Sequence, residues 1–146
     1  MSERETELTK HPARAVRPAP RITPQTASYW KAARDGQLLL GTCADCHKLS
    51  HPPQSVCPFC WSSNVGTRAA RGTATLNAFT LVYQSAVPAF RERLPYAIGY
   101  VELDEGVFVF SNIVNCDPDK IAIGMPLKAV FEKLNEESGA VLFEPA

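Results

Sequence analysis

The sequence lacks an excess of charge of either sign, because 15 lysine and arginine residues balance 15 aspartate and glutamate residues in a chain of 146. This neutrality argues against nucleic acid as a partner, since phosphate-binding proteins usually carry a basic excess. The sequence also has no run of 18 apolar residues, which excludes a membrane-spanning helix. The first ten residues are polar and charged, without the apolar stretch of a signal peptide. We therefore expect a cytoplasmic protein.

Recognisable catalytic motifs are missing as well. The sequence contains neither a nucleotide-binding glycine loop nor an HExxH motif. The charged residues nearest Cys116 are acidic, which is a poor setting for a nucleophilic thiolate. The neighbouring carboxylates of Asp104 and Glu105 are explained by a hairpin turn rather than by acid–base chemistry. We therefore expect no catalytic site in this chain.

What the chain does contain is enough apolar sequence for one real core. Hydrophobic residues make up 45% and charged residues 21% of the sequence, which are globular values. Prolines gather near the start, and residues 1–21 have few large apolar side chains. This segment is either a flexible tail or an extended arm on a partner, and its composition favours the tail. We predict two folded parts after it, residues 22–68 and residues 69–146.

A short helix is predicted at the beginning of the first part. Thr23 followed by Pro24 is typical of a helix start, and Gly36 is typical of a helix end. Between them Tyr29 and Trp30 share one face at helical spacing. This aromatic face packs on its own domain or serves as an interface.

Four of the five cysteines form two Cys-x-x-Cys pairs, Cys43–Cys46 and Cys57–Cys60, with ten residues between them. Each pair directs two sulfur atoms at one point, and two pairs supply the four thiolates that a structural zinc ion requires. Disulfides and thioredoxin-like redox chemistry are alternatives that this arrangement in a cytoplasmic chain does not favour. We predict one structural zinc ion, or iron in its place, held by Cys43, Cys46, Cys57 and Cys60. His47 and His51 lie between the pairs, but four sulfur atoms already complete the site.

Strands dominate the rest of the sequence. Alternation of β-branched and aromatic residues predicts strands at 72–83, 96–103, 107–114, 128–134 and 141–143, after a polar connector at 62–71. Five antiparallel strands in about 75 residues fit a small, partly open barrel of the OB type. We attribute most aromatic residues on these strands to core packing. Residues 84–95 form a loop with more apolar character than a solvent-exposed loop needs.

Motifs along residues 24–146 resemble a known family. They are Tyr29-Trp30, Gly36, the two cysteine pairs with His51-Pro52-Pro53 between them, Leu94-Pro95-Tyr96, Val101 to Gly106, Asp117-Pro118-Asp119 and Ile123-Gly124-Met125-Pro126. The combination resembles the acyl-CoA-associated family in which a rubredoxin-like zinc ribbon precedes a C-terminal OB fold. The resemblance implies a mostly β chain with an N-terminal helix, the zinc ribbon and a five-stranded barrel. It also implies a small partner subunit of thiolase-superfamily enzymes, or of hydratases with a hotdog fold, in lipid, sterol, isoprenoid or polyketide metabolism.

The function predicted on this basis is that of a non-catalytic accessory subunit. It docks on a thiolase-superfamily enzyme (an acyltransferase, aldolase or thiolase), stabilises it and shapes its acyl or CoA site. One alternative is a subunit of a hotdog-fold enoyl-CoA hydratase complex. Another is a module that binds single-stranded nucleic acid. Six basic against ten acidic residues in 71–146 argue against the last.

Several apolar residues are candidates for the docking surface, because a body of this size has limited room to bury them. These candidates are Tyr29, Trp30, Phe59, Trp61, Val87, Phe90 and Leu94. The alternative is that they close the seam between the ribbon and the barrel.

Overall fold

The N-terminal helix begins later than the sequence predicts. The computed structural model describes residues 16–146, and its helix α2 covers Ala27–Arg34. Residues 23–26 form a turn that leads into the helix, and in this turn the hydroxyl groups of Thr23 and Thr26 lie 3.0 Å apart. The predicted start at Thr23 and Pro24 is therefore wrong, because the Thr23 hydroxyl bonds to another side chain instead of capping a helix. Gly36 ends the helix as predicted, with a φ of 86° that favours glycine.

The ribbon is a three-stranded antiparallel sheet in the order β2-β1-β3. It consists of β1 (Leu39–Cys43), β2 (Leu49–Ser50) and β3 (Val65–Ala69). Strand β3 occupies half of the segment that we expected to be a polar connector, residues 62–71. That expectation is wrong because β3 is an exposed edge strand, so it shows no alternation of apolar and polar residues. Its pairing with β1 runs from Leu39 opposite Ala69 to Cys43 opposite Val65.

The five predicted barrel strands are all present. They are β4 (Thr73–Val82), β5 (Tyr96–Leu103), β6 (Phe108–Ile113), β7 (Pro126–Lys133) and β8 (Gly139–Pro145). The barrel is closed in the order β4-β5-β6-β8-β7 rather than partly open. It closes because β6 and β8 also pair, in parallel, at Ile113 and Phe143. The connections carry helix α3 (Pro88–Arg91) and a 3-10 turn, Pro118–Lys120.

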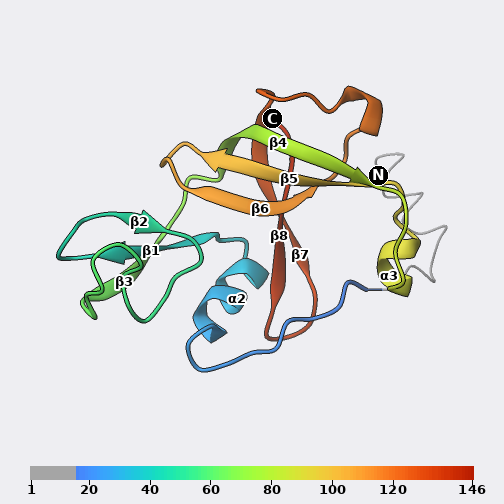
Figure 1. Cartoon of the computed structure of the whole chain (residues 1–146). Coiled ribbons are helices and arrows are strands. Elements are labelled where there is room, and N and C mark those ends of the chain that lie inside the picture. The colour runs from blue at the N-terminus through green and yellow to red at the C-terminus, as the bar shows by residue number, and fades with distance from the viewer. Residues whose placement is uncertain (1–15) are drawn as a thin grey trace.

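The ribbon lies beside the barrel, and helix α2 packs against the β7–β8 hairpin (Figure 1). Leu38 and Leu40, at the start of the ribbon, are buried in the same core as Leu76 and Phe143 of the barrel. Gly139 in β8 sits directly on the backbone of α2 at Arg34. The two parts of the molecule therefore share one core, and α2 is fixed between them.

The chain before α2 lies on its own barrel. Residues 1–15 of the predicted tail lie outside the described residues, but residues 16–21 run below the β7–β8 hairpin toward α3 (Figure 1). The Arg17 side chain is only 11% exposed and pairs with Glu132 at 2.9 Å. Its Nη1 group also donates to the Asn112 side-chain oxygen at 3.1 Å. Residues 16–21 thus form an arm, held by the chain itself.

Candidate functional site

The four paired cysteines converge at one end of the ribbon. Cys43 ends β1, and the two turns place all four Sγ atoms within 4.8 Å of one another. Cys43 Sγ lies 3.6 Å from Cys60 Sγ, and Cys46 Sγ lies 3.6 Å from Cys57 Sγ. In each turn a backbone N–H group points at a sulfur atom, from Cys46 to Cys43 at 3.5 Å and from Phe59 to Cys57 at 3.4 Å. The two turns are built alike, because the N–H group after each cysteine pair donates to the carbonyl of its first cysteine, from His47 to Cys43 at 3.0 Å and from Trp61 to Cys57 at 2.9 Å.

This geometry fits a tetrahedral metal ion. Zinc–sulfur bonds of about 2.3 Å place the sulfur atoms of a tetrahedron roughly 3.8 Å apart, close to the distances observed. The N–H group of Cys46 lowers the pKa of the Cys43 thiol to about 6, whereas burial and the neighbouring thiols raise the pKa of the Cys60 thiol to about 12. Without a metal ion the four sulfur atoms therefore share protons, and a bound cation favours all four thiolates. Four cysteines form a site for one metal ion, and a shell of four thiolates leaves no open position for a substrate.

The two histidines near the cysteines do not belong to this group. His47 is exposed and has a φ of 61°, in the position directly after the first cysteine pair. His51 is half-buried, and its Nε2 lies 2.8 Å from the hydroxyl of Tyr29 on helix α2. Burial lowers the pKa of His51 to about 4 and raises the pKa of Tyr29 to about 12, so both groups are neutral near pH 7.

Three apolar side chains form an exposed patch beside the metal site, which we call the ribbon tip: Val56, Phe59 and Trp61. Trp61 is 85% exposed and Phe59 is 52% exposed. Trp61 follows the second cysteine pair with a φ of 66°, and its N–H donates to the Cys57 carbonyl at 2.9 Å. The Lys48 ammonium lies 5.1 Å from the centre of the Phe59 ring. The metal-holding turn thus fixes the backbone of this patch.

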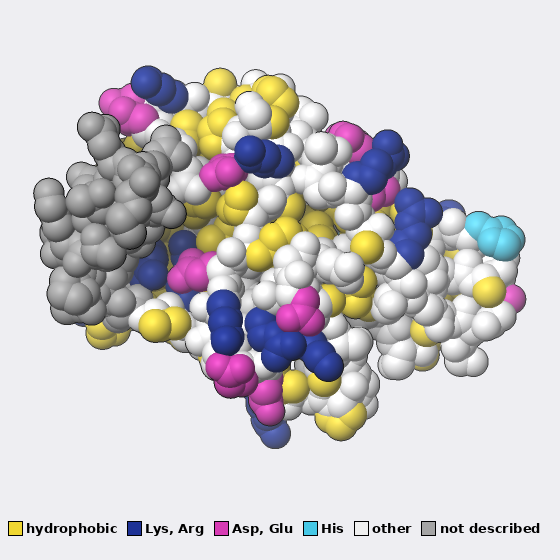
Figure 2. All heavy atoms as spheres, turned by 180° about the vertical axis from the view of Figure 1, so that it is seen from behind, with side chains coloured by type: hydrophobic (Ala, Val, Ile, Leu, Met, Phe, Trp, Pro, Cys, Tyr) yellow, Lys and Arg dark blue, Asp and Glu magenta, His cyan; other side chains and the backbone are white. Residues whose placement is uncertain are grey.

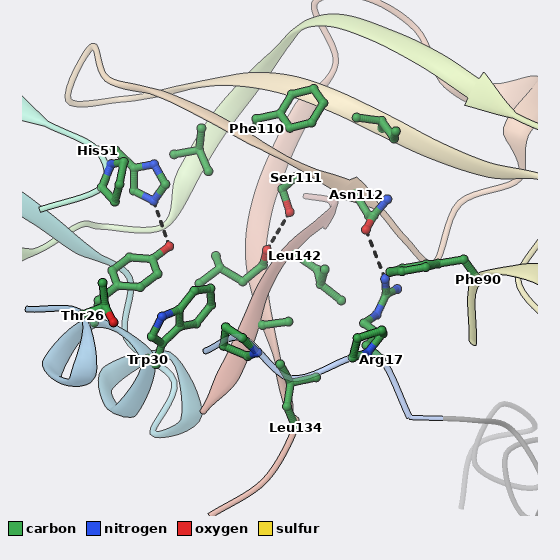
Figure 3. Close-up of a pocket in the computed structure, with 18 of the residues that line it drawn as sticks. Arg17, Thr26, Trp30, His51, Phe90, Phe110, Ser111, Asn112, Leu134 and Leu142 are labelled. Atoms are coloured by element: carbon green, nitrogen blue, oxygen red, sulfur yellow. Dashed lines mark hydrogen bonds between the residues drawn. The ribbon is translucent and has the colours of Figure 1, made fainter. Parts of the chain in front are cut away.

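Three other docking candidates come together in a different place. Tyr29 and Trp30 on α2 and Phe90 on α3 line one groove of about 590 Å³ between α2, the arm and the barrel. In Figure 3, His51 lies at one end of this groove and Arg17, Phe90 and Asn112 lie at the other. Of the remaining two candidates, Val87 is 41% exposed before α3, and Leu94 is half-buried.

The structure also brings to the groove and the surface side chains that the sequence did not indicate. Arg17 belongs to the predicted tail, yet its guanidinium lies against the Phe90 ring, 5.8 Å from its centre. Phe110 on β6 lines the groove and is 70% exposed. Tyr100 and Phe108 stack on the outside of the barrel with ring centres 4.8 Å apart. Assigning these aromatic residues to the core was wrong, because β5 and β6 have aromatic or aliphatic side chains on both of their faces.

The surface charges are mixed. Figure 2 shows the face opposite to that of Figure 1, where Lys and Arg side chains alternate with Asp and Glu side chains around a recess with apolar side chains. This face of the described residues presents no continuous basic groove. Within residues 16–146, no helix is long and apolar enough to cross a lipid bilayer.

Comparisons with family models match both folded parts. Residues 30–66 match the model described as the rubredoxin-like zinc ribbon domain of ChsH2. Residues 67–132 match the model described as the C-terminal OB-fold domain of ChsH2. The metal site and the barrel therefore correspond to two domains that are known together.

Three similar proteins illustrate the range of the likeness. A probable enoyl-CoA hydratase alpha subunit from Thermomonospora curvata is 36% identical over 98% of this chain and 44% of that protein. A DUF35 domain-containing scaffold protein from Methanothermobacter thermautotrophicus is 30% identical over 77% of this chain and 86% of that protein. A chain in the structure of the Ltp2-ChsH2(DUF35) aldolase is 35% identical, with a TM-score of 0.77 over 87% of this chain and 98% of that chain. The chain thus spans less than half the length of the hydratase subunit.

Proposed function

The chain belongs to the ChsH2 family of zinc-ribbon and OB-fold proteins, and we propose that it acts as a non-catalytic accessory subunit of an acyl-CoA enzyme complex. The observation that carries the proposal is the structural likeness between this chain and a chain of the Ltp2-ChsH2(DUF35) aldolase. The match covers 98% of that aldolase chain. Relatives named as scaffold proteins support the same role.

The first candidate for the partner is a thiolase-superfamily enzyme, which the chain stabilises and whose acyl or CoA site it shapes. The aldolase neighbour and the motifs shared with partner subunits of such enzymes support this choice. The second candidate is a hotdog-fold enoyl-CoA hydratase. The 36% identity to a hydratase alpha subunit favours it, although more than half of that subunit has no counterpart in this chain.

The chemistry of the described residues supports an accessory role. A metal ion held by four thiolates is closed to substrates and serves to fold the ribbon. The Sγ atom of Cys116 approaches the carbonyl oxygen of Asp117 at 3.5 Å, and a carbonyl group is not a base. Catalysis is therefore assigned to the partner enzyme.

We assign the main contact with the partner to the ribbon tip. Exposed aromatic side chains on a rigid support are typical anchors of protein interfaces, and Trp61 exposes 85% of its surface. Such exposure argues against the alternative in which Trp61 closes the seam between ribbon and barrel. Val87, at 41% exposure, is a secondary contact on the other side of the molecule.

The experiment is co-purification of the chain with a thiolase-superfamily enzyme and, separately, with a hotdog-fold hydratase, followed by native mass spectrometry. We expect a stable complex with the cognate enzyme and an increase in its activity or solubility, while the isolated chain has no turnover. Turnover by the isolated chain, or the absence of a complex with both enzymes, contradicts the proposal. Capture of single-stranded nucleic acid instead supports the rival function.

The Trp61→Ala variant tests the assigned contact. Removing a buried aromatic anchor weakens an interface by about 1–3 kcal/mol, so we expect a corresponding loss of affinity at unchanged Tm and zinc content. Ile123→Ala is the matched control, because Ile123 is a large apolar residue 69% exposed on the barrel. Equal affinity of the Trp61→Ala variant and the control contradicts the assignment.

A further inference from the structure

The groove between α2, the arm and the barrel has the size and lining of a small-molecule site. Its volume of about 590 Å³ falls within the range of ligand pockets, roughly 300–1,000 Å³. Trp30 from α2, Phe110 from β6 and Leu142 from β8 form its walls (Figure 3). These walls are apolar, and they come from three elements that the fold holds rigidly together.

Three of the polar side chains that line the groove are already paired with protein groups. The Tyr29 hydroxyl bonds to His51 at one end. The Ser111 hydroxyl donates to the Val141 carbonyl at 2.6 Å. The Asn112 amide donates to the Ala97 carbonyl at 3.0 Å. Because these three groups have partners and most of the other lining residues are apolar, the walls of the groove favour a hydrocarbon over a polar occupant.

The other end of the groove contains a cation with hydrogen-bonding capacity to spare. Arg17 uses Nε for Glu132 and Nη1 for Asn112. Its Nη2 group makes no hydrogen bond to any residue among 16–146, although a guanidinium carries five N–H donors. The same arginine also lines a second cavity of about 630 Å³, which shares Tyr96 and Asn112 with the groove. An occupant that is apolar along its length and carries an oxygen acceptor or negative charge at one end complements this arrangement.

We propose that the groove binds an acyl group directly, with the hydrocarbon between Trp30 and Phe110 and the carboxylate or thioester carbonyl at Arg17. The choice of an acyl group rests on the proposed function, whereas the groove and its charged end are features of this chain alone. Binding therefore requires no partner enzyme.

The test uses tryptophan fluorescence, because the chain has only two tryptophans and one of them lines the groove. The Trp61→Phe variant leaves Trp30 as the only reporter. Bromine quenches tryptophan on contact, so 12-bromododecanoate below its micelle concentration should quench Trp30 saturably. Unbrominated dodecanoate should reverse the quenching. The matched control is Trp30→Phe, in which the exposed Trp61 should show no saturable quenching.

Two substitutions separate the charge of Arg17 from its role in holding the arm. Arg17→Met keeps contact with Phe90 but removes the donors, and binding should weaken about tenfold or more, since hydrogen bonds to charged groups are strong. Glu132→Gln also loosens the arm, but it removes the carboxylate that competes for Arg17. If Arg17 binds the acyl oxygen, Glu132→Gln binds the probe as tightly as the parent or more tightly. If Arg17 only holds the arm, both variants weaken binding alike, which overturns the assignment of the charged end.

A third variant tests the groove itself. Ala140→Phe places a ring in the groove from β8 and should abolish quenching while circular dichroism and zinc content stay unchanged. Saturable quenching that persists in this variant, or that fails in folded Trp61→Phe protein, overturns the proposal. Competition by dodecanoyl-CoA distinguishes a thioester ligand from a free acid. These outcomes are independent of complex formation, so failure here leaves the accessory function standing, and the reverse also holds.

Discussion

Replacing Gly139 by alanine should force helix α2 away from the β7–β8 hairpin and so destabilise the protein. A Cβ atom at this position lies 2.5 Å from the Arg34 nitrogen, 2.6 Å from the Arg34 Cα and 2.7 Å from the Ala33 carbonyl carbon. All three are backbone atoms of α2, so no side-chain rotation relieves the contact. Carbon atoms pack best about 3.5–4.0 Å apart, so the hairpin and the helix must separate by roughly 1 Å.

The expected cost follows from this overpacking. Forcing extra atoms into a packed contact destabilises a protein by about 1–3 kcal/mol. For a chain of this size a loss of ~2 kcal/mol lowers the Tm by roughly 6–8 °C. Backbone strain adds nothing, because Gly139 is not among the glycines with positive φ. Since α2 carries Tyr29 and Trp30, the groove should widen as well, and the near-ultraviolet circular dichroism should change.

The assay is urea denaturation of the zinc-loaded protein, with Gly66→Ala as the matched control. Gly66 also lies in a strand, but its nearest contact is the Thr42 hydroxyl at 3.2 Å, which can rotate away. We expect the control to lie within about 0.5 kcal/mol of the parent protein, as is usual for surface substitutions. A Gly139→Ala variant as stable as the control would refute the close packing of α2 on the hairpin.

Three further predictions concern the metal, the pH dependence and the remaining cysteine. Cys43→Ser or Cys57→Ser should abolish zinc binding and unfold the ribbon, because the free energy of metal binding is folding free energy in such modules. Metal analysis and circular dichroism measure these two effects. A variant that has lost its metal but keeps the thermal stability of the parent protein contradicts the prediction. Burial lowers the pKa of His51 from 6.5 to about 4 in the folded protein. As the pH drops, His51 therefore takes up its proton in the unfolded chain before it does so in the folded protein. The free energy of unfolding should fall between about pH 6.5 and about pH 4 and should be constant below pH 4 as far as His51 is concerned. His51→Asn should flatten this part of the profile in urea denaturation, and an unchanged slope would exclude His51 as its origin. Cys116→Ala should leave the stimulation of the partner enzyme intact, and a loss of activity with complex formation preserved would reopen the question of catalysis.

The metal site was predictable because its determinants are local. All four cysteines lie within one short stretch, and each Cys-x-x-Cys pair specifies its own turn. The barrel strands were predictable for a similar reason, since alternation of residue types reports on each strand separately. The helix start was less certain, because the turn at Thr23 depends on which hydroxyl group its side chain meets.

The alternation of apolar and polar residues gave wrong predictions where both faces of a strand are apolar or where both are exposed. In β6, Phe108 and Phe110 point outward while Val109 is buried between them, and nothing in the order of these residues indicates which face is inside. In β3 the side chains are exposed, so the strand exists only through its pairing with β1. Backbone pairing with a distant segment leaves no signal in the strand itself.

The sequence by itself therefore determined the ligands of the metal and the strands of the barrel, because neighbours along the chain specify both. Only the tertiary structure decided which aromatic residues are exposed and which share a groove. Arg17 meets Asn112 and Glu132 across 95 and 115 residues, and Tyr29 meets His51 across 22. Such contacts form when packing of the whole core brings separate segments together, and no local pattern encodes them.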